Sequence, residues 1–393
     1  NVARLNFSHG SHEEHAARIS RIKEVRKELG IPVAIMLDTK GPEIRTGELS
    51  AGKVELVAGE KVTLTTEIIS GDANRFSISH ENLPNEVSPG CRILIDDGLI
   101  QLEVDDVFDT EMVCSVLNGG TLGSKKSINL PGMSIELPAL TEKDRSDIIF
   151  GIQQKVDYVA ASFVRKPHDV LEIRKVLERN GGDRIDIISK IENQEGVENI
   201  DRILNVSDGI MVARGDLGVE IPAEDVPLVQ KTIIRKCNLL GKPVITATQM
   251  LDSMMRNPRP TRAEVGDVAN AVFDGTDAVM LSGETAAGSY PVESVKTMYN
   301  IVVKSEDSEE YARRKKPDHG ELTITNAVSE GACQIAEQLD AQTIIAATSS
   351  GHTARMISKY RPDCGILAVT DKVTTVRRLA LVWGVNCIYT PEF

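Results

Sequence analysis

The 393-residue sequence predicts an α/β protein built on a (β/α)8 barrel (a TIM barrel), with an all-β lid domain inserted into it and an α/β domain after it. Three observations support this fold class. Short β-branched runs alternate with amphipathic helical stretches, which implies parallel strands. The alternation is interrupted once, between residues 41 and 140, by a stretch with no helical period. It resumes after residue 140, and a further α/β unit follows a charged segment near the C-terminus. One ordinary hydrophobic core could not hold a chain of this length, so we expect two or three domains.

Composition narrows the class of protein. The net charge is −13, with 41% hydrophobic and 26% charged residues, which is typical of a globular protein and argues against binding to nucleic acid or a membrane. The six cysteines are scattered without a C-x-x-C pair. Such spacing favours free thiols in a reducing compartment, so we expect the cytoplasm. No apolar run approaches the roughly 20 residues of a membrane span.

The barrel is expected over residues 1–41 and 140–307. Its strands are predicted at 2–8, 33–38, 157–163, 185–191, 209–213, 243–248 and 278–282. Helices are predicted at 12–29, 167–179 and 223–240. These are seven strands, whereas a closed barrel of this kind has eight. Because residue 1 falls in mid-strand, we expect the first strand to precede it and the natural N-terminus to be absent.

The interruption, residues 42–139, is expected to be a β-barrel-like lid inserted after the third barrel strand. Its predicted strands are 53–57, 61–66, 92–95, 100–107 and 112–117, separated by glycine-containing turns.

The charged segment 308–316 is expected to be a linker to an α/β domain at 317–393. That domain is predicted to contain helices at 325–339, 352–360 and 373–381 and strands at 343–347 and 365–369. Its sheet is left partly uncovered, so we expect the C-terminus to be cut as well.

The first strand carries polar residues in phase. Residues two apart share a face of a strand, so Arg4, Asn6 and Ser8 lie together at the carboxyl end, where barrels of this kind place their active sites. Asp38 ends the neighbouring strand, about 4.8 Å away. Oxygens from Asn6, Ser8, Asp38 and the Thr39 carbonyl could therefore hold a monovalent cation. Polar residues that simply mark a strand end would explain Ser8, but not an arginine in phase with it.

Two further cations, Lys40 and Arg45, follow in the segment that enters the lid. They add positive charge near the expected site. The alternative is that they are ordinary solvated surface residues without a role in the site, above all Lys40.

A second group lies on later strands. Lys190 and Glu192 share one face of a strand end, and Asp216 follows the next strand. Two carboxylates with open positions suit Mg²⁺, and a lysine beside them suits a transferring phosphoryl group. A structural Lys–Glu ion pair is the alternative. Thr248, in phase with Thr246, could bind a carboxylate or relay a proton, although threonine is common in strands.

Two sequence patterns resemble known kinds of binding site, a zinc site and a phosphate-binding loop, but each lacks part of the pattern. His9, His12 and His15 recur every third residue, but this spacing drifts around a helix and no cysteine or carboxylate set completes a zinc site. Residues 119–127 are glycine-rich but lack the spacing and the helix of a phosphate-binding loop. A lid lysine that contacts a nucleotide phosphate stays an open alternative.

At these residues the sequence resembles the pyruvate kinase family, and the resemblance covers essentially all of the chain. The motifs NVARLNFSHG, LDTKGPEIRTG, ISKIEN, MVARGDLG and ATQML follow one another in the family's order. The resemblance implies transfer of the phosphoryl group of phosphoenolpyruvate to ADP, giving pyruvate and ATP, the last step of glycolysis. It also implies a lid that closes over nucleotide, a C-terminal regulatory domain and usually a homotetramer.

Residue roles are carried over from the family position by position. The implied catalytic residues are Lys190, Arg4 and Thr248, and the substrate pocket adds Gly215 and Asp216. Glu192 and Asp216 match the Mg²⁺ (or Mn²⁺) ligands, and Asn6, Ser8, Asp38 and Thr39 match the K⁺ site. Asn6, His9, Arg45 and Lys126 match residues that meet the nucleotide. Thr348, Ser349, Ser350, Gly351 and Thr353 resemble the loop that binds a sugar-phosphate or nucleotide effector.

Two other functions, a lyase or aldolase and a non-catalytic role, share some of these sequence features. A barrel lyase or aldolase would also hold Mg²⁺ with Glu and Asp, but it does not explain the inserted β-domain or the cation cluster. A non-catalytic protein that keeps the fold would show degraded catalytic positions, and the mapped positions are intact. Formation of ATP from phosphoenolpyruvate separates these alternatives.

Overall fold

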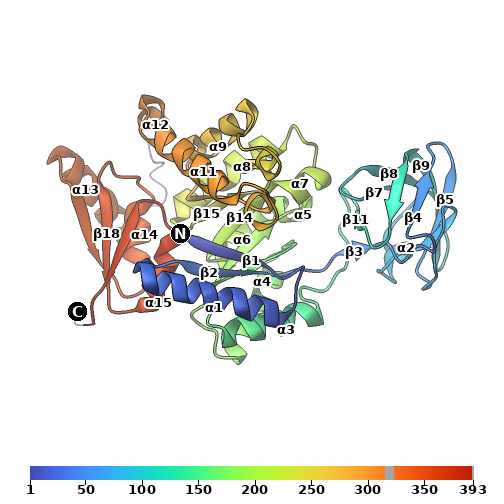
Figure 1. Ribbon diagram of the computed structural model, residues 1–393, viewed down its shortest axis with the longest axis horizontal. Coiled ribbons are helices and arrows are strands. Elements are labelled where there is room, and N and C mark those ends of the chain that lie inside the picture. Colours follow the sequence, from blue (N-terminus) through green and yellow to red (C-terminus); the bar gives the residue numbers. More distant parts are fainter. Residues whose placement is uncertain (315–322, 392–393) are drawn as a thin grey trace.

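The computed structural model describes residues 1–314 and 323–391. Figure 1 shows three parts in a row, with a barrel-like α/β part in the middle, a β-rich part at one end and a small α/β part at the other. The central part belongs to the predicted fold class, and the two flanking parts lie at the positions in the chain where they were expected.

The central sheet has seven parallel strands, in the order β1-β2-β12-β13-β14-β15-β16. The strands are β1 (Val2–Asn6), β2 (Ala34–Asp38), β12 (Tyr158–Ala161), β13 (Asp186–Ile191), β14 (Gly209–Ala213), β15 (Val244–Ala247) and β16 (Ala278–Met280). Each lies inside a predicted range, so these strand predictions are confirmed. Several strands end earlier than predicted, and the residues released from them, such as Ser8 and Thr248, lie in turns at the mouth.

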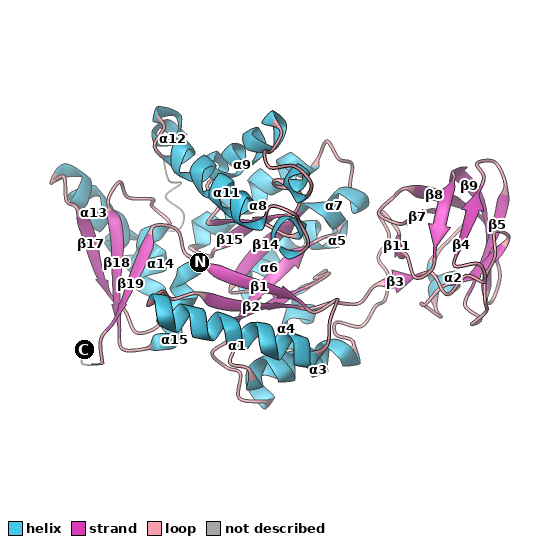
Figure 2. Cartoon of the chain, viewed as in Figure 1, coloured by secondary structure: helices cyan, strands magenta, loops and turns pink. Residues whose placement is uncertain are grey.

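Helices cover the outside of this sheet (Figure 2). They are α1 (His12–Leu29), α3 (Glu142–Gln153), α4 (Pro167–Arg179), α5 (Gln194–Glu198), α6 (Ile200–Val206), α7 (Arg214–Glu220), α8 (Val226–Leu240), α9 (Arg262–Asp274), α10 (Gly283–Ala286) and α11 (Pro291–Glu306), with a 3-10 turn, η1 (Asp252–Met255). The first helix has the predicted bounds because a capping box, Ser11 with Glu14, starts it and Gly30 in the left-handed region ends it. The helix predicted from residue 223 begins three residues later, at Val226, with Pro227 in its first turn.

The two faces of the sheet have separate cores. Leu5, Phe7, Ile35 and Leu37 pack outward against the helices. Met36, Tyr158, Ile188 and Met211 fill the interior. Because strand side chains alternate, the residue that follows in phase with Met36 is Asp38, and the one in phase with Ile188 is Lys190. The interior is therefore apolar at depth and becomes charged at the carboxyl ends of the strands.

The β-rich part is formed by residues between β2 and β12. It contains β3 (Ile44–Arg45), β4 (Lys53–Leu56), β5 (Lys61–Thr65), β6 (Arg75–Ser77), α2 (Leu83–Glu86), β7 (Arg92–Ile95), β8 (Ile100–Val107), β9 (Glu111–Asn118), β10 (Gly120–Gly123) and β11 (Ser127–Asn129). Seven strands form one sheet, β3-β11-β7-β8-β9-β5-β6, and β10 pairs with β4. The five predicted strands are present, whereas the short elements β3, β6, β10, β11 and α2 were not predicted. This part has its own core, centred on side chains such as Phe76 and Ile93.

The C-terminal part is a three-stranded parallel sheet with helices. Its elements are α13 (Ile324–Gln338), β17 (Thr343–Ala347), α14 (His352–Ser358), β18 (Gly365–Thr370), α15 (Val373–Arg378), a 3-10 turn η2 (Leu379–Leu381) and β19 (Val385–Tyr389). The last strand was not predicted. The segment α15–η2 of this part packs on the barrel at the amino ends of the strands, where Arg377 pairs with Asp157 at 2.6 Å and Leu381 joins the interior core. The effector-type loop therefore lies away from the barrel mouth.

One prediction for this region was wrong. The segment 308–316, expected to be a linker, contains the helix α12 (Glu309–Arg314), which Ser308 starts by bonding the Tyr311 amide, and residues 315 and 316 lie outside the described residues. In the part of the chain that the structure describes, no helix has the length and apolar character needed to cross a membrane.

Candidate active site

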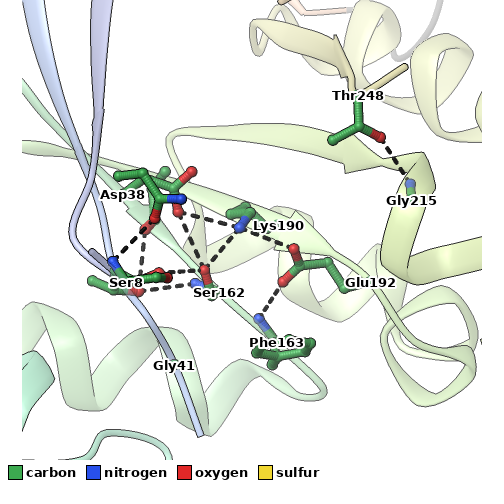
Figure 3. A network of polar contacts seen from close by, with 12 residues as sticks. Ser8, Asp38, Gly41, Ser162, Phe163, Lys190, Glu192, Gly215 and Thr248 are labelled. Atoms are coloured by element: carbon green, nitrogen blue, oxygen red, sulfur yellow. Dashed lines mark hydrogen bonds and ion pairs between the residues drawn. The ribbon is translucent and has the colours of Figure 1, made fainter. Parts of the chain in front are cut away.

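Polar side chains from the ends of four strands meet at the carboxyl end of the central sheet (Figure 3). The parallel register pairs Asn6 with Asp38 across β1 and β2. Ser162 follows β12, and Lys190 and Glu192 come from β13 and its end. The strand ends thus bring together residues that lie up to about half the chain apart.

Asp38 is the fully buried centre of one half of this cluster. Arg4 contacts its Oδ2 through Nε at 2.7 Å and through Nη2 at 2.6 Å. Its Oδ1 faces the Lys190 ammonium at 3.2 Å and lies 3.2 Å from Ser162 Oγ. Burial alone would raise the pKa of Asp38, but Lys190 and Arg4 outweigh it and lower the pKa. Asp38 is therefore a fixed negative charge between two cations.

Lys190 connects this centre to a second carboxylate. Its Nζ lies 2.8 Å from Ser162 Oγ and 2.9 Å from Glu192 Oε1. Burial opposes its charge, yet the carboxylates of Asp38 and Glu192 raise its pKa overall. Lys190 is thus held as an ammonium in a site almost closed to solvent.

Glu192 and Asp216 form an acidic pair on adjacent strand ends. Glu192 Oε2 accepts a 2.6 Å hydrogen bond from the Phe163 amide, and Asp216 lies in the first turn of α7. Burial, followed by the neighbouring charge of Asp216, raises the pKa of Glu192 to about 7. Burial also raises the pKa of Asp216. Two neighbouring carboxyl groups whose pKa values are raised suit a divalent cation, whose charge would favour their ionised forms.

Further oxygens surround Asp38. Asn6 Oδ1 accepts from the Ser8 amide at 3.0 Å, and the Thr39 carbonyl accepts from Ser162 Oγ at 2.6 Å. The Thr39 hydroxyl instead donates to the Ala160 carbonyl. The Thr39 carbonyl oxygen, and not its hydroxyl, therefore accepts from the serine that contacts Asp38 and Lys190.

Thr248 lies on the other side of the mouth. Its Oγ1 accepts a 2.8 Å hydrogen bond from the Gly215 amide (Figure 3). Thr248 and the following Gln249 both have left-handed backbone conformations, with φ of 71° and 54°. Non-glycine residues seldom adopt such angles, and they do so most often at functional sites.

A cleft of about 480 Å³ separates the mouth from the β-rich part. Its lining combines His9 and Asp216 from the barrel side with Arg45 and Lys126 from the other side. Arg45 pairs with Glu43 at 2.6 Å, and Lys126 pairs with Asp96 at 2.9 Å. The predicted nucleotide residues His9, Arg45 and Lys126 thus share one cleft, whereas Asn6 is not in its lining.

The remaining sequence candidates are placed elsewhere. Lys40 makes a 4.0 Å pair with Glu43. His12 pairs with Asp147, and buried His15 stacks on the Phe7 ring with centroids 3.9 Å apart, so the three histidines have different surroundings. In the described ranges no group of three or more His, Cys, Asp and Glu side chains is placed to hold a metal ion.

The effector-type loop joins β17 to α14. Gly351, with φ of 85°, precedes the helix and donates from its amide to Thr348 Oγ1 at 3.0 Å. Ser349 contacts Asp371, and the Ser350 Oγ accepts from the His352 amide. Thr353 lies in the first turn of α14.

Sequence reasoning missed several members of the site. Ser162 bridges Asp38 and Lys190, and the Phe163 amide, on a residue with φ of 54°, holds Glu192. Both fall at the end of a predicted strand, so the rule that singled out Ser8 would have found Ser162. Asp96 and Glu43, the partners of the cleft cations, had no comparable signal.

Comparisons with known proteins agree with this geometry. The family model described as "Pyruvate kinase, barrel domain" matches residues 1–295, and "Pyruvate kinase, alpha/beta domain" matches residues 326–393. A pyruvate kinase from Clostridium acetobutylicum is 56% identical over 100% of this chain and 84% of its own length. One from Bacillus licheniformis is 58% identical over 98% of this chain, which spans 66% of that relative. A crystal structure of a pyruvate kinase from Cryptosporidium parvum, 44% identical, superposes with a TM-score of 0.94 over 100% of this chain and 82% of that one.

The sequence resemblance, the fold and the family models therefore lead to one conclusion: the chain belongs to the pyruvate kinase family, a family of phosphotransferases.

Proposed function

We propose that the charged cluster at the barrel mouth catalyses the reaction of that family, transfer of the phosphoryl group of phosphoenolpyruvate to ADP. The observation that carries the proposal is the position of Lys190, an ammonium held between the carboxylates of Asp38 and Glu192, at 3.2 and 2.9 Å. A transferring phosphoryl group spreads negative charge over its oxygens, and a preorganised cation stabilises that charge without reorganising.

The residues present fit a divalent metal. Glu192 is buried and Asp216 half-buried, both carboxyl groups have raised pKa values, and one hydrogen-bonds the other. Mg²⁺ commonly takes one or two carboxylates and completes its coordination with water and phosphate oxygens. We therefore assign Glu192 and Asp216 as the protein ligands of Mg²⁺ or Mn²⁺, which would neutralise phosphoryl charge when bound.

A monovalent cation fits the other side of the cluster. Asn6, Ser8, Asp38 and the Thr39 carbonyl offer hard oxygens on two neighbouring strands. Asp38 is the only full negative charge in this set, and its pKa is lowered, so it stays ionised. We assign these four residues to K⁺.

The chain's own residues bind and orient the reactants. Arg4, with a side chain about 20% exposed, can reach a phosphoryl group while Asp38 fixes its guanidinium. Lys190 lies on the opposite side of Asp38, where Asp38, Ser162 and Glu192 hold its ammonium, and phosphoryl oxygens would compete with these partners for it. The reaction thus needs positioned charges and no nucleophilic side chain.

The carboxylate end of phosphoenolpyruvate is assigned to the turn that starts α7. Gly215 and Asp216 lie at a helix N-terminus, a favourable place for an anion, and the carboxylate would compete with Thr248 Oγ1 for the Gly215 amide. The Thr248 hydroxyl, 2.8 Å from the Gly215 amide, would then face the carbon that is protonated when the enol becomes pyruvate.

The β-rich part, about residues 42–139, is proposed to act as a lid over ADP. His9, Arg45 and Lys126 line the cleft beneath it. The acidic partners Glu43 and Asp96 occupy the two lid cations, and nucleotide phosphates would compete for them. Closure would also exclude water and so limit hydrolysis of the transferring group. The barrel then comprises about residues 1–41 and 140–307.

Further assignments follow family precedent and concern regulation. Thr348, Ser349, Ser350, Gly351 and Thr353 are proposed to bind a phosphorylated effector within the C-terminal domain, residues 317–393. Exposed apolar side chains on α11 (Val292, Val295, Tyr299) and α13 (Val328, Ile335) favour a homotetramer. Six free cysteines favour the cytoplasm. Light scattering measures the oligomeric mass, and its change when a sugar phosphate is added tests the effector loop and the homotetramer together.

The test of function is a coupled assay of pyruvate and ATP from phosphoenolpyruvate and ADP. We expect activity that requires Mg²⁺ or Mn²⁺ and rises with K⁺. Folded protein that forms neither product with both cations present would overturn the proposal, and so would pyruvate formed without ATP, which indicates hydrolysis of phosphoenolpyruvate with water as the phosphoryl acceptor.

A further inference from the structure

The turn after β15 is held in a backbone conformation that its residues do not favour. Thr248 and Gln249 are consecutive non-glycine residues with positive φ, 71° and 54°. This conformation is unfavourable for residues other than glycine and persists only where the surroundings impose it. The turn carries the hydroxyl that faces the proposed substrate carbon, so whatever imposes its geometry bears on catalysis.

The side chain of Arg214 makes the contacts that impose it. Its Nη2 donates to the Thr248 carbonyl at 2.8 Å, and its Nε donates to the Ala247 carbonyl at 3.4 Å. These carbonyls belong to the two peptide units that flank the Thr248 Cα, so their directions depend on the φ and ψ of Thr248. A planar guanidinium with donors in a fixed fork holds two neighbouring carbonyls in a way that an ammonium cannot.

Arg214 is itself fixed from the outer helices. Its Nη1 pairs with Asp267 of α9 at 2.7 Å and lies 3.4 Å from Gln230 Oε1 of α8. Its side chain is only 13% exposed. The guanidinium is therefore anchored on two helices while it holds a turn of the barrel mouth.

The same residue also starts the helix that carries the other half of the pocket. Arg214 is the first residue of α7, and its neighbours Gly215 and Asp216 supply the amide bonded to Thr248 and a proposed Mg²⁺ ligand. The main chain of Arg214 thus positions Gly215 and Asp216 on one side of the proposed substrate carbon, and its side chain positions Thr248 on the other.

We infer that Arg214 is a positioning residue for the protonation step: its guanidinium, anchored by Asp267, holds the Thr248 hydroxyl in register with Gly215 and Asp216. The inference rests on the proposed function, in which Thr248 faces C3 of the enol. Protonation forms one C3–H bond from a proton supplied through water or the hydroxyl. The reverse step breaks one such bond, so solvent deuterium enters the methyl group of pyruvate without net reaction.

The experiment compares this exchange with phosphoryl transfer in the full-length chain. Proton NMR follows loss of the pyruvate methyl signal in D₂O with Mg²⁺, K⁺ and ATP, and a coupled assay measures ATP formation. For Arg214→Lys, which keeps the charge but loses the fork, we expect exchange to fall about 10- to 100-fold, the effect of a misplaced reacting group. ATP formation should fall much less, and KM for phosphoenolpyruvate should stay within about three-fold.

Asp267→Asn is the second variant, because it leaves the mouth intact and removes only the anchor. Like Arg214→Lys, it should lower the ratio of the exchange rate to the rate of ATP formation. Arg174→Lys is the matched control, since Arg174 pairs with Asp208 beyond the amino end of the same sheet. Its ratio should equal that of the parent.

An unchanged ratio in both Arg214→Lys and Asp267→Asn would overturn the inference. So would a fall in exchange and ATP formation by the same factor, which indicates only a loss of folded protein. Failure of the proposed function is separate, because the parent itself would then form no ATP.

Discussion

Lys190 Nζ lies 3.2 Å from Asp38 Oδ1, although β13 and β2, which carry the two residues, are not neighbours in the sheet. Ser162 follows the strand between them, β12, and its hydroxyl oxygen lies 3.2 Å from Asp38 Oδ1 and 2.8 Å from Lys190 Nζ. Both charged side chains are buried. The pair therefore joins the proposed K⁺ side of the mouth to the proposed Mg²⁺ side, and its charges would be poorly screened by solvent.

This arrangement predicts that Asp38 is required for stability. Asp38→Asn leaves two cations, Arg4 and Lys190, without their shared anion in a buried site. Loss of one partner of a buried pair costs about 3–5 kcal/mol. Urea unfolding should show a decrease of that size in the free energy of unfolding.

The control for this variant is Asp105→Asn, since Asp105 pairs with Lys61 on the lid surface and an exposed pair contributes about 0–1 kcal/mol. Equal losses from the two substitutions would contradict the assignment of Asp38 as the centre of a buried network.

The raised pKa of Glu192 predicts a pH-dependent stability. Burial and Asp216 raise it to about 7 in the folded chain, while an exposed glutamate titrates near 4.5. Between these two values the folded state binds more protons than the unfolded state, so stability falls as pH rises from about 4.5 to 7. Glu192→Gln should remove this part of the decline in Mg²⁺-free urea titrations.

Other buried acids also titrate, so the quantity to compare is the difference between parent and Glu192→Gln at each pH. A difference that stays constant from pH 4.5 to 7.5 would show that Glu192 is not perturbed. Added Mg²⁺ should restore stability to the parent at pH 7.5 and much less to the variant.

The cleft under the lid predicts a selective loss of nucleotide affinity. Lys126→Met removes a cation that faces the cleft, so KM for ADP should rise about 5- to 20-fold, while KM for phosphoenolpyruvate changes little. Lys125→Met is the matched control, because the neighbouring Lys125 is exposed and pairs with Glu48 outside the cleft. A similar rise in KM for ADP from both substitutions would place the nucleotide elsewhere.

Much of the fold could be predicted because local signals agree with it. The helix at residues 12–29 has a capping box at one end and a left-handed glycine at the other, and its bounds were found from sequence. The buried barrel strands are continuous apolar runs, which periodicity detects. Short elements escaped prediction because pairing with distant strands creates them: β3 has two residues and is a strand only because it pairs with β11.

The site residues that could be predicted are those that share one face of a predicted strand end. In-phase polar residues at strand ends gave Arg4, Asp38, Lys190 and Glu192, which the structure brings together. Contacts that depend on the turns after the strands were not predictable. The Phe163 amide on Glu192 and the Arg214 guanidinium on the Thr248 carbonyl both require left-handed residues that carry no sequence signature.

The central claim, that the ammonium of Lys190 stabilises the transferring phosphoryl group, is tested most directly by Lys190→Met. The measurement is kcat for ATP formation, with phosphoenolpyruvate binding followed in parallel and the exposed Lys175→Met as control. We predict a decrease of about 100-fold or more in kcat with binding retained, the size expected when one preorganised charge is removed. A folded variant whose kcat stays within about three-fold of the parent would contradict the account.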